Sequence, residues 1–207
     1  MKKYMIVILA ILLISCNGKT QETKIPQDIK VTKDPNQVIK ENEKKATEKQ
    51  YDNYGELIST ISFKVKTDSK DFKDRIIPWA SIEKPQQDIP NLIGKDEIVI
   101  KQTSIEVIID YPLTNQYEFI LTSRSGFTRS LLLTEISKHY YKLYEEEEKT
   151  ATIKTIPMEK RTKMYNRNQT NGKYGVWGHD IADLVLAEIS LYKKSNGELI
   201  VILNIES

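Results

Sequence analysis

Residues suited to chemistry are concentrated near the carboxyl end of the chain, between Asn166 and Asp183. Three of the eight glycines lie in the segment Gly172–Asp180, where they alternate with aromatic, histidine and carboxylate side chains. Because glycine permits sharp bends and close backbone approach, such a segment can form a ligand-binding loop. Aromatic faces would stack on a sugar or peptide, and amide and cationic groups would donate hydrogen bonds. The candidate ligand-binding residues of this segment are Asn166, Arg167, Asn168, Asn171, Tyr174, Trp177 and His179.

Two other interpretations of the segment stay open. In a structural one, the glycines permit a turn, Trp177 covers the core, and Asp180 or Asp183 caps a helical turn. In a catalytic one, His179, Asp180 and Asp183 act as acid and base in a hydrolase. Glycoside hydrolysis would need two carboxyl groups about 5 to 9.5 Å apart, and the sequence does not fix this separation. Since the chain contains no nucleophile elbow, phosphate-binding loop or metalloprotease motif, we expect binding rather than catalysis.

Metal and cofactor sites are not expected. The pair His179-Asp180 is similar to the metal-binding His-Asp pair of phosphohydrolases, but that family needs further histidines, and this chain has only two. The run Glu145–Glu148 offers oxygen ligands for a divalent cation. Consecutive helical residues point about 100° apart, however, so a solvated charge run is the preferred interpretation. The single cysteine excludes a cysteine-based zinc site and an internal disulfide.

Two further positions belong to a predicted helix. Gly126–Arg129 precedes its first turn, where free amides and the Arg129 guanidinium could bind an anion. The alternative for Arg129 is a structural ion pair with an aspartate or glutamate. His139 lies on or beside the apolar stripe of the same helix, and we expect it to be a packed or surface histidine.

The amino terminus predicts an export signal. Lys2 and Lys3 precede an unbroken apolar run, Ile6–Ile14, which is too short to span a bilayer. The sequence Leu13-Ile14-Ser15-Cys16 resembles the lipobox of bacterial lipoproteins, which implies cleavage before Cys16 and attachment of diacylglycerol and a further acyl chain, such as palmitate, to that residue. Two or more acyl chains hold a protein stably at a membrane. A transmembrane anchor and ordinary secretion are the alternatives; by the resemblance, Asn17 implies the outer membrane.

Composition separates a tether from a folded domain. The segment 17–50 is rich in lysine and acidic residues and has no aromatic residue, which predicts a disordered tether with a helical tendency near 38–49. A single domain is expected over 51–207. Without Lys2 and Lys3 the chain has 29 basic and 29 acidic residues (31 − 2 against 29), which argues against a nucleic-acid binder.

Alternating apolar residues predict the strands of this domain. Ile61, Phe63 and Val65 share one face of a first strand, and 97–101, 104–111 and 117–122 follow as strands, the last two forming an antiparallel hairpin. Residues 184–193 and 198–205 form a second hairpin, because Asn196-Gly197 suits a tight turn. Since both faces of 198–205 carry apolar residues, we expect a central strand that is covered on both sides.

One long helix is predicted over Thr128–Glu148, with Thr128 as its N-cap. Its apolar residues repeat at the spacing of a single buried stripe. The predicted fold class is therefore α+β, with an antiparallel sheet packed against one long helix and an irregular insertion. The buried stripe consists of Leu132, Leu133, Ile136, Tyr140, Leu143 and Tyr144.

Three segments of the domain, Ile109–Leu113, Gly126–Arg129 and Tyr174–Asp180, resemble parts of an uncharacterised family of bacterial envelope lipoproteins, which implies location but no activity. We expect a lipid-anchored envelope protein at the outer membrane, on the side of the periplasm or of the exterior, whose domain binds an envelope protein, a glycan or another ligand. An envelope hydrolase acting on glycan or peptide is one alternative. An immunity-type lipoprotein that occupies a toxin is the other.

Overall fold

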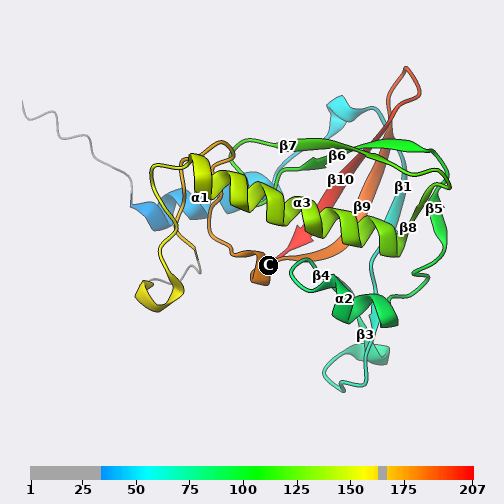
Figure 1. Cartoon of the computed structure of the whole chain (residues 1–207), viewed down its shortest axis with the longest axis horizontal. Coiled ribbons are helices and arrows are strands. Elements are labelled where there is room, and N and C mark those ends of the chain that lie inside the picture. Colours follow the sequence, from blue (N-terminus) through cyan, green and yellow to red (C-terminus); the bar gives the residue numbers. More distant parts are fainter. Residues whose placement is uncertain (1–33, 163–166) are drawn as a thin grey trace, which may run out of the picture. The chain divides into compact units, whose positions relative to one another are not determined.

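A computed structural model describes residues 34–162 and 167–207, and Figure 1 shows an α+β fold built on a mixed sheet of six strands. Five strands form a continuous path in the order β1-β9-β10-β6-β7, and β4 pairs with β9 beside this path. The bounds of these strands are β1 (Glu56–Ser62), β4 (Ala80–Ser81), β6 (Ser104–Ile109), β7 (Tyr117–Thr122), β9 (Val185–Lys193) and β10 (Leu199–Glu206).

Both predicted hairpins are present. β6 and β7 pair antiparallel, with Ser104 opposite Thr122. β9 and β10 pair antiparallel, with Lys193 opposite Leu199. Gly197 in the connecting turn has φ 89°, a conformation that glycine adopts without steric cost. Local turn chemistry therefore sets the register of the second hairpin.

The sheet is mixed, whereas the sequence predicted an antiparallel one. β10 pairs in parallel with β6, and Ile200 lies opposite Glu106. The hairpin with β9 occupies one edge of β10, so its other edge is free for a second partner. Because β7, β8 (Phe127–Thr128), α3 (Arg129–Thr150), the following loops and β9 all separate β6 from β10, the chain has the length that a parallel pairing requires.

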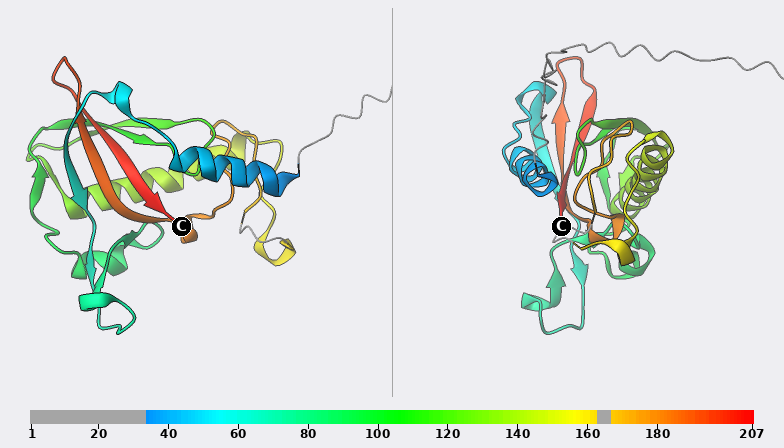
Figure 2. Two further views of the ribbon diagram at one scale, coloured as in Figure 1. Left: turned by 180° about the vertical axis from the view of Figure 1, so that it is seen from behind. Right: turned by 90° about the vertical axis from the view of Figure 1, so that its left-hand side faces the viewer.

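α3 covers one face of the sheet. Thr128 is its N-cap, and the Thr128 hydroxyl accepts a 3.2 Å hydrogen bond from the Leu131 amide. The predicted apolar stripe is buried and joins the side chains of Ile61, Phe63 and Val65 in the main core. The second view in Figure 2 shows α3 on one side of the strands and α1 (Pro35–Thr47) toward the other. The predicted helix is confirmed, although it ends two residues later.

β10 is buried on both faces, as the sequence predicted. Its side chains Leu199, Val201 and Leu203 belong to the main core, while Ile200 and Ile202 form a second cluster with Ile108. Three tyrosines pack against this second cluster: Tyr51, Tyr54 and Tyr192.

The folded unit begins earlier than the sequence predicted, since α1 lies within the segment expected to be a tether. The described residues belong to one compact unit. Ile39 of α1 is only 2% exposed. Beyond the helix, the Lys49 ammonium lies 2.9 Å from the carboxylate of Asp110, which is 4% exposed. Composition concealed this packing because it depends on a few residues within a polar helix. No helix in the described part of the chain has the length and apolarity needed to cross a bilayer.

The remaining elements are short. They include two small two-stranded sheets, β2–β3 and β5–β8. Their bounds are η1 (Asp52–Tyr54), β2 (Val65–Lys66), η2 (Lys73–Arg75), β3 (Ile76–Ile77), α2 (Pro85–Asp88), η3 (Ile89–Asn91), β5 (Ile98–Ile100), β8 (Phe127–Thr128), η4 (Met158–Lys160) and η5 (Ile181–Asp183).

The N-cap of α3 gives a first prediction. Replacing Thr128 by alanine removes the acceptor for the Leu131 amide and should lower the free energy of unfolding by about 1 kcal/mol. Thr128→Ser keeps the hydroxyl and should cost only a small fraction of this. Urea denaturation monitored by circular dichroism measures both variants, and equal losses in the two would contradict the cap.

Candidate functional site

The glycine-rich loop is held by one buried carboxylate at the end of α3. The side chain of Glu147 is 0% exposed. Its Oε1 accepts hydrogen bonds from the Thr170 hydroxyl (2.6 Å) and the Gly172 amide (2.7 Å). Its Oε2 accepts from the amides of Tyr174 (2.8 Å) and Gly175 (3.1 Å). Because a carboxylate has about four acceptor positions, these four donors saturate it.

The charge of Glu147 is favoured in this setting despite its burial. Burial raises the pKa of the carboxyl group. The hydrogen bonds from Thr170 and the three amides lower it by more than burial raises it, so the net pKa lies below the ordinary value of 4.5. The loop also needs glycine at one position, since a Cβ on Gly172 would lie 2.7 Å from the Glu147 carboxylate. The Glu147 carboxylate leaves no room for a side chain at position 172, and it accepts the hydrogen bond of the Gly172 amide.

The interpretation of Glu145–Glu148 as a solvated charge run is wrong for Glu147 and incomplete for its neighbours. Glu146 accepts a 2.6 Å hydrogen bond from the Tyr174 hydroxyl, and Glu148 accepts one of 2.8 Å from the Thr155 hydroxyl. Glu145 is the exposed member and pairs with Lys149 at 2.5 Å. The α3 terminus therefore binds two loops through its acidic residues. Among the described residues, no group of three histidine, cysteine or acidic side chains could hold a metal ion.

The two aromatic candidates of the loop are buried and do not offer free stacking faces. Tyr174 is 4% exposed and meets the Tyr117 ring edge-on at 5.2 Å between centroids. Trp177 is 2% exposed and meets the Tyr111 ring edge-on at 5.2 Å. This arrangement corresponds to the structural interpretation of the segment, because both side chains fill the interior.

Two arginines converge on the first acidic candidate. Arg161 contacts Asp180 with both terminal nitrogens, and Arg167 Nη1 lies 3.3 Å from Asp180 Oδ1. Arg167 is 6% exposed, and its guanidinium lies over the Tyr144 ring at 5.0 Å. Asp183 accepts a 2.8 Å hydrogen bond from the Asp180 amide and so caps η5. Both carboxylates are therefore engaged in structural contacts.

The histidine candidate lies in a different contact. His179 Nε2 lies 2.7 Å from Glu43 of α1, and the Tyr111 hydroxyl lies 3.1 Å from the same carboxylate oxygen. The Ser207 hydroxyl is 2.8 Å from that of Tyr111. This cluster joins α1 to the body of the domain, so His179 has a packing role that the sequence did not reveal.

The asparagine candidates shape the wall of a cavity. Asn168 Oδ1 accepts from the Ile156 amide at 2.8 Å. Asn171 Oδ1 accepts from the amides of Thr152 and Ile153 at 3.0 and 2.7 Å. These side chains replace the missing backbone partners of an irregular segment. They therefore hold the loop that follows α3 against the loop that precedes η5.

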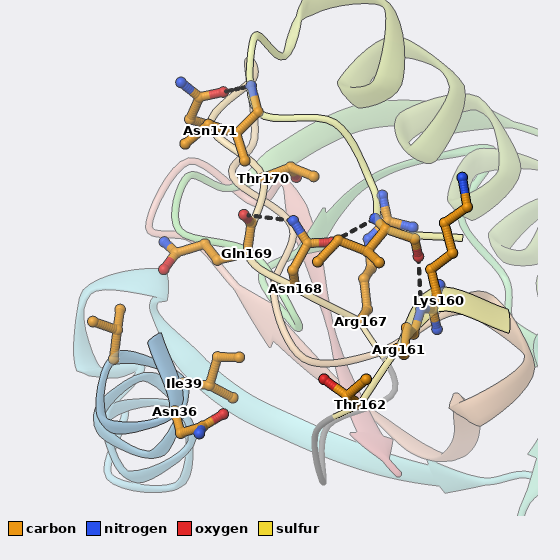
Figure 3. A pocket seen from close by; sticks show the side chains of 13 residues that line it. Asn36, Ile39, Lys160, Arg161, Thr162, Arg167, Asn168, Gln169, Thr170 and Asn171 are labelled. Atoms are coloured by element: carbon orange, nitrogen blue, oxygen red, sulfur yellow. Dashed lines mark hydrogen bonds between the residues drawn. The ribbon is translucent and has the colours of Figure 1, made fainter. Parts of the chain in front are cut away.

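Between these loops and α1 lies a cavity of about 560 Å³, shown in Figure 3. Its volume is in the range of small-molecule sites. The figure shows Asn36 and Ile39 on α1 across from Asn168, Arg161 and Arg167 on the loops. The described residues that line it are Asn36, Val38, Ile39, Ile153, Ile156, Lys160, Arg161, Thr162, Arg167, Asn168, Gln169, Thr170 and Asn171.

The cavity contains only part of the set predicted from sequence. It brings together Arg167, Asn168 and Asn171, but not Tyr174, Trp177 or His179. Sequence reasoning missed the residues that α1 and the segment 153–162 contribute. The exposed apolar side chains Ile153 and Ile156, 53% and 42% exposed, were the available signal for that segment. Asn166 and Cys16 lie outside the described residues.

Arg129 and His139 lie apart from the cavity lining. Arg129 pairs with Glu97 at 2.6 Å and donates through Nε to the Ser62 carbonyl, which corresponds to the structural alternative. His139 stacks on Phe119 with ring centroids 3.5 Å apart. Burial and the nearby Lys142 lower the pKa of His139.

The hydrogen bonds to Glu147 generate a prediction with a pH signature. Glu147→Gln places an amide NH₂ against donors and should lower the free energy of unfolding at pH 7 by about 3 kcal/mol. Because the folded-state pKa is depressed, the contribution of the carboxylate is complete above the unfolded-state pKa of 4.5 and is lost as pH falls through the folded-state value.

The difference between wild type and Glu147→Gln in urea unfolding should therefore shrink between pH 7 and pH 3. The control is Glu145→Gln, since Glu145 is 65% exposed and its loss should change stability little at either pH. A gap for Glu147→Gln that is equally large at both pH values would contradict the assignment.

Comparison with known proteins found no relative of this chain. No family model, curated protein or solved structure matches the chain.

Proposed function

We propose that the chain is a lipid-anchored protein of the bacterial envelope whose α+β domain binds a ligand in the cavity between α1 and the loops 153–171. The observation that carries the proposal is the cavity itself, with its volume of about 560 Å³ and its mixed lining. Binding sites commonly combine an apolar wall with a few directed polar groups. Here Val38, Ile39 and Ile153 supply apolar surface, and basic and amide side chains supply the polar groups.

The wall of the cavity is pre-formed, which favours binding. Asn168 and Asn171 each make hydrogen bonds to the 152–156 backbone, and Thr170 is fixed by Glu147. A ligand that enters such a site does not have to order these loops, so less conformational entropy opposes its binding.

The contacts of the catalytic candidates favour binding over hydrolysis. A general acid or base must reach the substrate proton directly or through one water molecule. Asp180 already contacts two arginines, and His179 Nε2 lies at hydrogen-bond distance from Glu43. None of His179, Asp180 and Asp183 lines the cavity.

The anchor is proposed from the lipobox-like sequence at Cys16. Eighteen residues, 17–34, separate Cys16 from the start of α1. A chain of that length spans at most about 65 Å. Because α1 forms one wall of the cavity, an acylated Cys16 would keep the cavity within that distance of the lipid surface.

Acylation is testable by metabolic labelling. Wild-type protein should incorporate radiolabelled palmitate and fractionate with membranes, because several acyl chains anchor a protein stably. Cys16→Ala should abolish the label and release the protein from the outer-membrane fraction. Lys19→Ala, three residues away, should behave like wild type. If Cys16→Ala fractionated with membranes as wild type does, the proposed lipid anchoring would be overturned.

Ligand capture is tested by filling the cavity. We expect the purified full-length protein to retain a component of an envelope extract that native mass spectrometry detects. Val38→Trp projects a large ring from α1 into the cavity and should reduce the captured fraction at least tenfold. Leu57→Trp, at a 52% exposed position of β1 outside the lining, is the matched control. Equal capture by Val38→Trp and wild type would overturn the site.

A further inference from the structure

Among the described residues, all charged side chains that line the cavity are basic. They are Lys160, Arg161 and Arg167, and no described aspartate or glutamate lines it. Two carboxylates compensate part of this charge from behind: Asp180 contacts both arginines, and Glu148 lies 4.0 Å from Arg167. Three basic groups against two carboxylates leave one positive charge. A singly charged anion would therefore complete the site.

Arg167 has unused hydrogen-bonding capacity at this wall. Its side chain is 7% exposed, and its Nε–H donor is buried without an acceptor among the described residues. Nη1 is directed to Asp180 at 3.3 Å, whereas the Nη2 contact with Glu148 at 4.0 Å exceeds hydrogen-bond distance. An unpaired donor on a buried cation is costly unless an acceptor satisfies it. Nη2 is therefore the donor of Arg167 that can bind a carboxylate oxygen of a ligand in the cavity, because Nε is buried.

Lys160 supplies a second, adaptable cation. It is exposed, and it forms no ion pair in the described part of the chain. An ammonium group on a flexible side chain can contact an anion in several positions. It therefore contributes electrostatic attraction, whereas the planar guanidinium also fixes the orientation of the anion.

The opposite part of the lining is aliphatic. Val38 and Ile39 come from α1, and Ile153 and Ile156 come from the loop after α3. Ile153 and Ile156 are 53% and 42% exposed, so apolar atoms of a ligand would remove their surface from water. No aromatic side chain of residues 34–162 and 167–207 lines the cavity.

We propose that the cavity binds an aliphatic monocarboxylate, with the carboxylate at Lys160 and Arg167 and the aliphatic group against the four apolar side chains. This inference rests on the proposed binding function and specifies its ligand class. The same chemistry occurs in a short fatty acid and in the C-terminal residue of a peptide that ends in leucine.

The experiment compares acids with their neutral amides. Full-length protein in lipid nanodiscs is titrated with hexanoate and hexanamide, and separately with N-acetyl-Ala-Leu and its C-terminal amide, by saturation-transfer NMR against empty nanodiscs. Each acid that fits should bind at least tenfold more tightly than its amide, equivalent to about 1.4 kcal/mol. The pair that shows the difference identifies the fatty acid or the peptide terminus as the source.

The variants assign the charge preference to named residues. Lys160→Met should remove most of the difference between acid and amide, and Lys160→Arg should retain it. Lys142→Met, which removes an exposed lysine of α3 outside the lining, should leave it unchanged. Arg167→Lys keeps the charge but loses the Nη2 donor and should also weaken acid binding, with folding checked by circular dichroism.

Equal affinities for acids and amides, or binding of none of the four probes, would overturn the ligand class. If capture from the envelope extract remained sensitive to Val38→Trp in that case, the proposed binding function would stand without it. If acids and amides bound equally and capture were also unaffected by Val38→Trp, both the ligand class and the binding function would be overturned.

Discussion

The geometry of the cavity depends on one buried carboxylate. Glu147 lies near the carboxyl end of α3, where the helix dipole disfavours negative charge and burial removes water. Three backbone amides and one hydroxyl offset both costs by directing hydrogen bonds at its two oxygens. Since Thr170 both binds Glu147 and lines the cavity, an interaction of the core positions part of the cavity wall directly.

The loops farther from Glu147 are held in place by the side-chain amides of asparagine residues. Thr170 lies between Asn168 and Asn171, and those two hold the 152–156 backbone. An irregular loop without such partners would leave its backbone groups to water and would sample many conformations. Polar side chains that suggest ligand contacts in the sequence therefore serve largely to fix the loops, and of the basic residues beside them Lys160 alone has no ion pair among the described residues.

Sequence patterns predicted those parts of the fold that depend on local signals. The Asn196-Gly197 hairpin, the β6–β7 hairpin and the Thr128-capped helix each follow from neighbouring residues. The parallel pairing of Ile200 with Glu106 did not, because it joins segments far apart in the chain. Trp177 and Tyr174 illustrate the same limit at the site: composition shows aromatic rings among glycines, and only the tertiary packing decides whether the rings face inward. α1 was missed as a cavity wall since its packing uses one buried isoleucine and the Glu43–His179 contact within a polar helix.

α1 connects the two proposed properties of the protein, its anchor and its ligand site. The helix follows the segment that begins at Cys16, and its residues Val38 and Ile39 form the apolar wall of the cavity. The polar contacts that hold α1 and its C-terminal extension to the domain include Glu43 with His179 and Tyr111, and Lys49 with Asp110. Because the Glu43 and Lys49 side chains are each 33% exposed, water competes for these contacts more than for those of the fully buried Glu147, so their net stabilisation is smaller. The wall on the α1 side is therefore the weaker of the two walls, and the loop side, fixed by Glu147, is the rigid one against which a ligand would be held.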